Sequence, residues 1–147
     1  MDIYEELVLQ YLTKDAHIFV NPQYSIRGDT GLEWSCPDYV ALDFRNRSVW
    51  VVEVSSAQRP TTLHERVRRR DHQWIANLRA QLTANRVVDD SWKHYVVDVF
   101  LRRDAVAPFQ REFRHDPAVR IHVLEDLRPP WEWTRSHLPG PEGPTEN

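Results

Sequence analysis

Two acidic residues stand near the ends of two predicted strands, at a spacing that suits a shared divalent cation. Asp38 follows Pro37 early in one strand, and fourteen residues separate it from Glu53, late in the next strand. Antiparallel pairing of these strands brings the two carboxylates to the same end of a hairpin. A carboxylate in a Val-rich, central strand is costly unless a charge compensates it. The sequence therefore predicts either a cation site or an ion pair between Glu53 and an arginine.

Mg²⁺ is a cation that such a pair of carboxylates would bind. It favours one or two carboxylates together with waters and phosphate oxygens. Asp38 and Glu53 would supply the carboxylates, and the backbone carbonyl of Val54 could supply a further ligand. Gln58, just beyond the second strand, could orient a water molecule. Acyl transfer is disfavoured, because Ser55 lacks the glycines of a nucleophile elbow.

A second chemical signal is a basic segment that follows these strands. The whole chain is acidic, with 19 Lys and Arg against 22 Asp and Glu. Residues 59–86 reverse this balance, with seven arginines against Glu65 and Asp71. One basic segment on an acidic protein is compatible with a nucleic-acid partner; a solvated helix face is the alternative. The candidate backbone-binding residues in this segment are Arg66, Arg68, Arg69 and Arg70.

Hydrophobic periodicity places these residues in one α/β domain. The predicted helices cover 2–13, 61–85 and 105–114, and the predicted strands cover 17–26, with an interruption at Asn21-Pro22, 36–44, 47–56, 93–102 and 119–124. A tight turn at Arg45-Asn46 makes the second and third strands a hairpin. The long helix is a crossover, so the strand after it should run parallel to the strand before it. The expected fold is a mixed central sheet flanked by helices, with its central strands covered on both faces.

Composition excludes several classes of protein. The chain has 147 residues, of which 41% are hydrophobic and 28% charged, which is enough for one domain with a buried core. No apolar run approaches the ~20 residues that span a bilayer, and no basic, apolar leader is visible, so we expect a cytoplasmic protein without a membrane partner. The single cysteine excludes an internal disulfide. Residues 1–127 form the predicted domain, and the Trp- and Pro-rich segment 128–147 is predicted to be an extension with a mobile tail.

The spacing of Asp38 and Glu53, within this order of elements, resembles the PD-(D/E)XK nuclease superfamily. The predicted N-terminal helix is similar to that of its Holliday-junction-resolvase-like branch, in which a Glu precedes an apolar helix end, a strand, a Gly-bearing loop and the Pro-Asp strand. The matching residues are Tyr4-Glu5-Glu6-Leu7-Val8, Tyr11-Leu12, Asn21-Pro22, Gly28, Gly31 and Pro37-Asp38-Tyr39-Val40. The resemblance covers roughly residues 4–101. It implies a restriction-endonuclease-like αβββαβ core and a Mg²⁺- or Mn²⁺-dependent nuclease, a hydrolase that cuts DNA.

The resemblance assigns roles to four side chains. Asp38 and Glu53 would be metal ligands, and Glu5 would be the helix carboxylate, although the helix dipole alone also favours a first-turn Glu. Ser55 stands where the family has its Lys, which stabilises the charge developing on the phosphate. Serine carries no charge, and losing one preorganised contact of this kind costs about 10²–10³ in rate. Either another cation substitutes, or the site is slow or inactive.

Arginines near the end of the Glu53 strand are candidates for the substitute cation. The parallel strand 93–102 would end beside Glu53, which places Arg102 and Arg103 at the correct end. Lys93 would lie at the opposite end of that strand. Further candidates on the long helix are Arg66, Arg69 and Arg70.

The sequence leaves more than one function open. The first is a metal-dependent endonuclease or exonuclease-like phosphodiesterase. The second is a catalytically degenerate nuclease-fold domain that binds nucleic acid or a protein partner, with Ser55 as the mark of the lost activity. A structural or assembly protein is a third, weaker interpretation. Junction-cutting members of the family are often dimers, so a homodimer is compatible with the resemblance.

Overall fold

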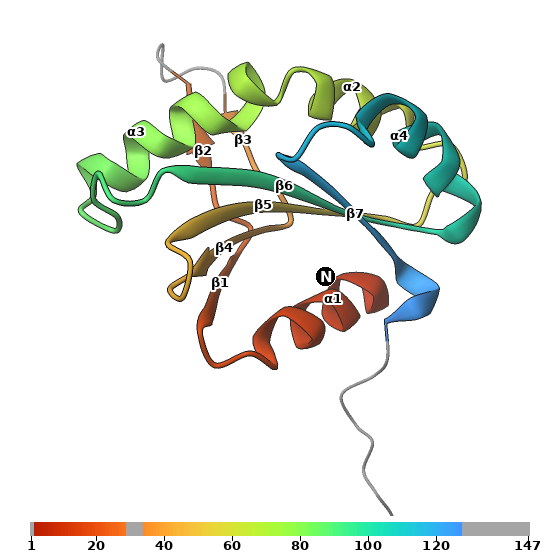
Figure 1. Cartoon of the computed structure of the whole chain (residues 1–147), viewed down its shortest axis with the longest axis horizontal. Helices are drawn as coiled ribbons and strands as arrows, with labels where there is room; N and C mark the ends of the chain where they lie inside the picture. The colour runs from red at the N-terminus through yellow and green to blue at the C-terminus, as the bar shows by residue number, and fades with distance from the viewer. Residues whose placement is uncertain (1, 29–33, 128–147) are drawn as a thin grey trace, which may run out of the picture.

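The protein has an α/β fold, in which a five-stranded mixed sheet lies between helices on both faces (Figure 1). The computed structural model describes residues 2–28 and 34–127. Gly31, one of the residues matched to the Gly-bearing loop, and the predicted C-terminal extension 128–147, with its mobile tail, lie outside the described residues. The helices are α1 (Ile3–Thr13), α2 (Thr61–Arg68), α3 (Ala76–Ala84) and α4 (Val106–Phe113). The strands are β1 (Ile18–Pro22), β2 (Ile26–Arg27), β3 (Trp34–Ser35), β4 (Tyr39–Asp43), β5 (Ser48–Ser55), β6 (His94–Leu101) and β7 (Val119–Val123).

The strand order of the main sheet is β1-β4-β5-β6-β7. The β1–β4 and β4–β5 pairs are antiparallel, and the β5–β6 and β6–β7 pairs are parallel. This arrangement confirms the predicted hairpin and the predicted parallel strand after the crossover. The parallel register pairs Ser48 with His94 and Ser55 with Leu101, so β5 and β6 both end at the same edge of the sheet.

The predicted strand 17–26 is divided next to its predicted interruption at Asn21-Pro22, and its two halves belong to different sheets. The main-sheet strand β1 ends at Pro22, which has no N–H to donate, and Gln23 has a φ of 54°, which turns the chain away. The following strand, β2, pairs only with β3 in a separate two-stranded ribbon. Strand β4 likewise begins at Tyr39 rather than at residue 36, so Asp38 precedes the strand.

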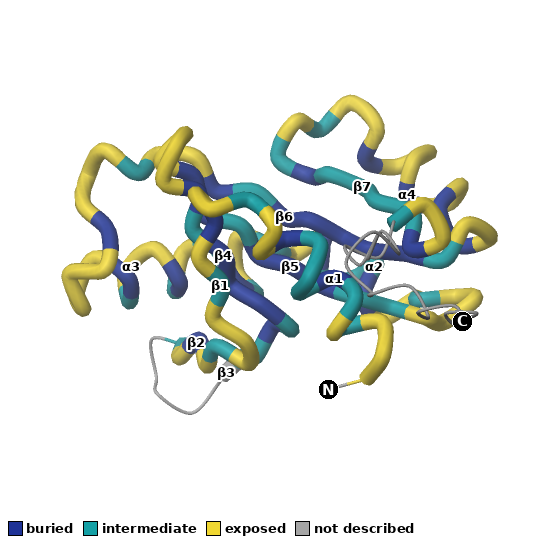
Figure 2. The backbone as a smooth tube through the Cα atoms, turned by 90° about the horizontal axis from the view of Figure 1, so that it is seen from below, coloured by how far each residue is buried: buried dark blue, intermediate teal, exposed yellow. Residues whose placement is uncertain are grey.

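Two buried clusters hold the helices on the sheet. Helices α2, α3 and α4 lie above one face in Figure 1, and α1 lies below the other. Figure 2 shows the buried stretches following the central strands, while outward helix faces are exposed. Val49 and Val51 of β5 belong to the cluster under α2, α3 and α4, while Val52 belongs to the cluster under α1. This alternation confirms that the central strands are covered on both faces.

The predicted continuous helix 61–85 is interrupted. Helix α2 ends at Arg68, and a π-helical turn, Asp71–Ile75, leads into α3. This wider turn contains Trp74, whose fully buried indole Nε1 donates to Ser35 Oγ at 3.1 Å. Gln73 Nε2 donates to the same oxygen at 3.0 Å. A long-range contact that a helical pattern does not encode therefore fixes this segment.

Helix α1 begins with a capping box. Asp2 Oδ1 accepts from the backbone N–H groups of Tyr4 and Glu5, and Glu5 Oε2 accepts from Asp2 N at 3.2 Å. Tyr39 of β4 donates its hydroxyl to the Glu5 carbonyl at 2.8 Å, which fixes the first turn of α1 over the start of β4. Among the helices of residues 2–28 and 34–127, none is long and apolar enough to cross a membrane.

Candidate functional site

Asp38 and Glu53 come together at the end of the β4–β5 hairpin. Tyr39 pairs with Val52, so the residue before Tyr39 faces the residue after Val52 across the two strands. Asp38 Oδ2 accepts from the backbone N–H of Val54 at 2.7 Å. The structure thus brings together the three residues that the sequence predicted as metal ligands.

The Glu53 carboxylate is buried and only partly satisfied. The residue is 3% exposed, and Oε2 accepts from Arg66 Nη2 at 2.9 Å. The other oxygen, Oε1, is buried without a hydrogen-bond partner among the described residues. Burial raises the pKa of Glu53 from its ordinary value of 4.5 to about 8, in spite of the opposing effect of Arg66. Asp38 and Glu5 add to the rise, because like charges disfavour ionisation.

The pKa of Asp38 is raised in the same way. Burial raises the pKa of this carboxyl from 3.8 to about 6, against the hydrogen bond from the Val54 N–H. The charge of Glu5 raises it further, and Arg66 lowers it. Two neighbouring acids that resist ionisation mark a place where positive charge would be favourable.

Glu5 belongs to this site and to the capping box of α1. Its side chain accepts from the Asp2 N–H at the helix start and lies close enough to Asp38 to raise the pKa of that carboxyl. The sequence allows two roles for Glu5: a carboxylate of the metal site and an acid that favours the start of the helix. Its position beside Asp38 and in the first turn of α1 is compatible with both. The hydrogen bond from the Tyr39 hydroxyl to the Glu5 carbonyl positions this turn. The sequence pattern gave no signal for Tyr39, because its partner is a backbone atom.

Arg66 is the arginine that reaches Glu53. Its Nη2 makes the 2.9 Å contact, and its Nε is buried without a hydrogen-bond partner among the described residues. Its Cζ lies 5.8 Å from the ring centroid of Trp74, so the π-helical turn supports the guanidinium from one side.

Cys36 also lies near the site. Burial raises the pKa of its thiol, and the charges of Asp38 and Glu53 raise it further.

The two arginines expected at the end of the parallel strand bond elsewhere. Arg102 Nη2 lies 3.0 Å from Asp104, two residues along the chain. Arg103 bonds to Asp126 through Nη2, and its backbone N–H donates to Glu125 at 2.7 Å. These acids follow β6 and β7 directly, so local pairing engages both arginines. Lys93 precedes the start of β6, at the end of the sheet opposite Glu53, as predicted.

Ser55 and Gln58 lie beyond the end of the buried part of β5. Ser55 is half-buried, and its Oγ accepts from the Ala57 N–H at 3.3 Å, which closes a local turn. Gln58 is exposed in the loop between β5 and α2. The Ser55 hydroxyl therefore has a local role in the turn that leads toward Arg66.

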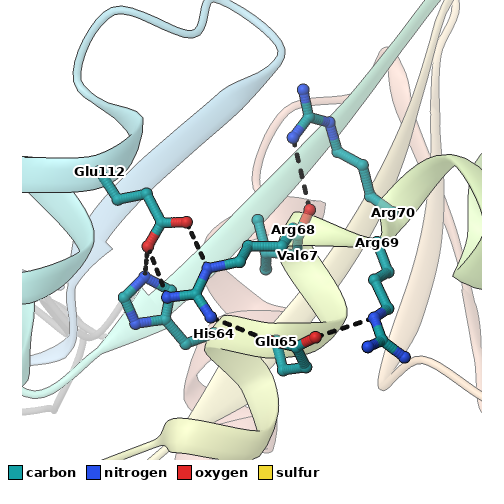
Figure 3. A network of polar contacts seen from close by, with 7 residues as sticks. All are labelled: His64, Glu65, Val67, Arg68, Arg69, Arg70 and Glu112. Carbon is teal, nitrogen blue, oxygen red and sulfur yellow. Dashed lines mark hydrogen bonds and ion pairs between the residues drawn. The ribbon is translucent and has the colours of Figure 1, made fainter.

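Acidic side chains neutralise much of the predicted basic segment (Figure 3). Arg68 bonds to Glu112 of α4 through two nitrogens and to Glu65 through a third. Glu65 also bonds to Arg69, whose Nε lies 2.8 Å from Oε1. Arg70 bonds to Asp116 and to the carbonyl of Val67. The sequence did not indicate Glu112 and Asp116 as partners, because they follow these arginines by 44 and 46 residues.

The protein offers few ligands for a metal ion at this site. No group of three or more His, Cys, Asp or Glu side chains in the described part of the chain is arranged to hold a metal ion. Asp38 and Glu53 provide two carboxylates, which is the number that Mg²⁺ commonly takes from a protein. Glu53 Oε1, buried without a hydrogen-bond partner among the described residues, is an oxygen that a cation could take as a ligand. The donor set therefore suits a hydrated Mg²⁺ or Mn²⁺ rather than a fully protein-bound ion.

Comparisons with known proteins give no relative. The chain matches no family model, no curated protein and no solved structure.

Proposed function

We propose that the chain is a metal-dependent phosphodiesterase of the PD-(D/E)XK type that acts on DNA. The observation that carries the proposal is the buried Glu53 carboxylate, with one bare oxygen, beside Asp38. Both acids have raised pKa values, which a neighbouring cation would lower. In the main sheet, α1 is followed by the strands β1, β4 and β5, then by the helical segment from α2 to α3, and then by the parallel strand β6. This order is compatible with a restriction-endonuclease-like core.

The residues of the site would divide the work. Asp38 and Glu53 would hold Mg²⁺ or Mn²⁺, and the Val54 carbonyl would face the same ion, because the N–H and C=O of one strand residue point to the same side. When bound, the ion would polarise the phosphodiester and lower the pKa of an attacking water. Water would add to phosphorus and lose a proton to the solvent, while the bond from phosphorus to the leaving sugar oxygen breaks and that oxygen takes a proton from the solvent. Gln58 would help to orient that water.

Arg66 would replace the missing family Lys. Ser55 at the Lys position has no charge, whereas Arg66 brings a guanidinium to the same carboxylate. Arginine stays protonated and can clamp a phosphate with two nitrogens, so it would stabilise charge but would not act as a base. Glu5 would hold the hydrogen-bond network around Asp38 in place.

A second candidate function is a catalytically degenerate domain that binds nucleic acid or a protein partner. The ion pair between Arg66 and Glu53 favours it, because the arginine already supplies the positive charge that a metal would supply. The presence of Ser55 in place of the family's Lys also favours this second function. The two candidates differ in whether the site binds a divalent cation and cuts DNA.

Cleavage of labelled duplex, single-stranded and junction DNA tests the proposal. Wild type should cut at least one of these substrates with Mg²⁺ or Mn²⁺ and none with a chelator. Asp38→Asn should abolish the cleavage, whereas Asp90→Asn, the same change at an exposed loop position before β6, should keep it. Cleavage that survives Asp38→Asn would contradict the assignment. Metal binding without cleavage of any substrate would favour the degenerate domain.

A further inference from the structure

A groove formed by residues with polar side chains lies against the candidate site. Its volume is about 410 Å³, and its lining residues are Thr61, Thr62, Glu65, Arg66, Arg69 and Gln73. Arg66 belongs to both places, because it lines the groove and its Nη2 lies 2.9 Å from Glu53 Oε2. A ligand in the groove would therefore meet the same side chain that now contacts Glu53.

The lining of the groove suits an oxyanion. Two arginines and two threonine hydroxyls can donate hydrogen bonds there, while the amide of Gln73 already donates to Ser35 Oγ at 3.0 Å. The acid in the lining, Glu65, bonds to Arg69 at 2.8 Å and to Arg68 at 2.9 Å, so its charge is compensated. Arginine clamps and hydroxyl groups are the usual protein contacts to the phosphates of nucleic acids. A phosphodiester is the ligand class that these donors fit.

Arg66 makes few contacts in its present position. One nitrogen bonds to Glu53, Nε has no partner among the described residues, and the side chain is 34% exposed. Its contact with Glu53 leaves the other carboxylate oxygen bare. The position thus satisfies neither side chain fully.

We propose that this groove holds a backbone phosphate of the nucleic-acid strand, and that Arg66 moves from Glu53 to that phosphate when Glu53 binds a divalent cation. The inference rests on the proposed function, since it needs a cation at Asp38 and Glu53. Two positive groups on one carboxylate repel each other. Once Glu53 is neutralised by a cation, the guanidinium of Arg66 gains more from an anion in the groove.

The proposed movement of Arg66 predicts how this side chain affects cation binding without DNA and DNA binding without a cation. Without DNA, Arg66 competes with the cation for Glu53, so it weakens cation binding. Without a cation, Glu53 retains Arg66, so Arg66 contributes little to DNA binding. Cation and DNA therefore strengthen each other's binding by the same factor. Arg69 pairs with Glu65 rather than with Glu53, so its contribution to DNA binding should not depend on the cation.

Binding measurements on matched variants test the inference without measuring catalysis. Fluorescence anisotropy of a labelled oligonucleotide with phosphorothioate linkages, which resist cleavage, gives DNA affinity with and without Mn²⁺, and calorimetry gives Mn²⁺ affinity without DNA. Arg66→Gln should raise Mn²⁺ affinity, leave DNA affinity without Mn²⁺ nearly unchanged, and lower DNA affinity with Mn²⁺ on the order of tenfold. Arg69→Gln should lower DNA affinity equally in both conditions. Arg45→Gln, at the opposite end of the hairpin, should change neither affinity.

The outcomes separate the inference from the proposed function. If wild type binds Mn²⁺ but Arg66→Gln lowers DNA affinity equally with and without Mn²⁺, or not at all, only the inference is overturned. If wild type binds no Mn²⁺, the proposed function and the inference both fail. Arg66→Lys retains the charge and should recover part of the Mn²⁺-dependent DNA affinity, which separates the charge from a folding defect. Thermal unfolding of each variant confirms that it is folded.

Discussion

Arg66 contacts only one of the two oxygens of the Glu53 carboxylate. Nη2 lies 2.9 Å from Oε2, while Oε1 is buried without a partner among the described residues. A buried ion pair repays its desolvation only when the remaining lone pairs are also satisfied. This pair leaves one oxygen unsatisfied beside a second acid, Asp38, so it is a poor arrangement for stability alone and a good one for a site that binds a cation.

The stability of the metal-free protein should fall as the pH rises. The pKa of Glu53 goes from 4.5 to about 8 on folding, and that of Asp38 from 3.8 to about 6, so the folded state binds more protons than the unfolded state in these windows. Unfolding then becomes easier with increasing pH. Above about pH 6 the fall should come from Glu53, which faces Arg66, Asp38 and Glu5.

Urea denaturation over a pH series measures this effect. The unfolding free energy of wild type is compared with that of Glu53→Gln at each pH. Histidines and other groups that titrate in both proteins contribute equally to both values, so their contribution cancels in the difference. This difference should change between pH 6 and 8 to the disadvantage of wild type. Addition of Mg²⁺ at pH 8 should stabilise wild type and not Glu53→Gln. A constant difference across this range would show that Glu53 ionises normally.

A lysine at position 55 should rescue an enzyme that has lost Arg66. Arg66→Ala should lower the rate of metal-dependent cleavage by about 10²–10³, the usual effect of losing one preorganised electrostatic contact. In wild type, Ser55→Lys should help little, since Arg66 already supplies the charge. In the Arg66→Ala background it should restore much of the rate, because its side chain leaves the strand on the same face as Glu53. Single-turnover cleavage of labelled DNA decides, with Arg45→Ala as control. An unchanged rate in Arg66→Ala would contradict the assigned role.

The salt dependence of DNA binding should distinguish among the arginines of α2. Each phosphate contact contributes about −0.9 to the slope of log affinity against log salt. Arg69→Gln should therefore reduce the slope by about 0.9 in metal-free buffer. Arg68→Gln should leave it unchanged, because Arg68 bonds to Glu112 and Glu65 through three nitrogens, whereas Arg69 bonds to Glu65 through Nε and its side chain is 72% exposed. Equal reductions in the two variants would contradict the view that ion pairs withdraw Arg68 from DNA.

The sequence predicts the carboxylate pair because local rules determine it. Alternating apolar residues and a short turn define the β4–β5 hairpin, and antiparallel pairing then brings Asp38 to Glu53. The sequence does not predict which arginine contacts Glu53. Arg102 bonds to the acid two residues away, and Arg68 to an acid 44 residues away on another helix. The partner of Arg68 depends on how α2 and α4 pack together, which periodicity does not encode.

The interruption of the long helix shows the same limit. Its apolar spacing predicts one helix, but the π-helical turn Asp71–Ile75 holds Trp74 where its indole reaches Ser35. That contact joins the helix to the separate β2–β3 ribbon, which the pattern of residues 17–26 did not predict. Trp74 of the same turn also contacts the guanidinium of Arg66, so the π-helical turn helps to position this side chain at the candidate site.

Calorimetric titration with Mn²⁺ is the most direct test of the central claim that Asp38 and Glu53 form a cation site. Wild type should bind Mn²⁺ more tightly at pH 8 than at pH 6, because both acids must ionise to bind it. Asp38→Asn and Glu53→Gln should each lose at least about tenfold in affinity, while Asp90→Asn binds as wild type and all three variants stay folded. Unchanged Mn²⁺ binding in both site variants, or no binding by wild type, would contradict the account.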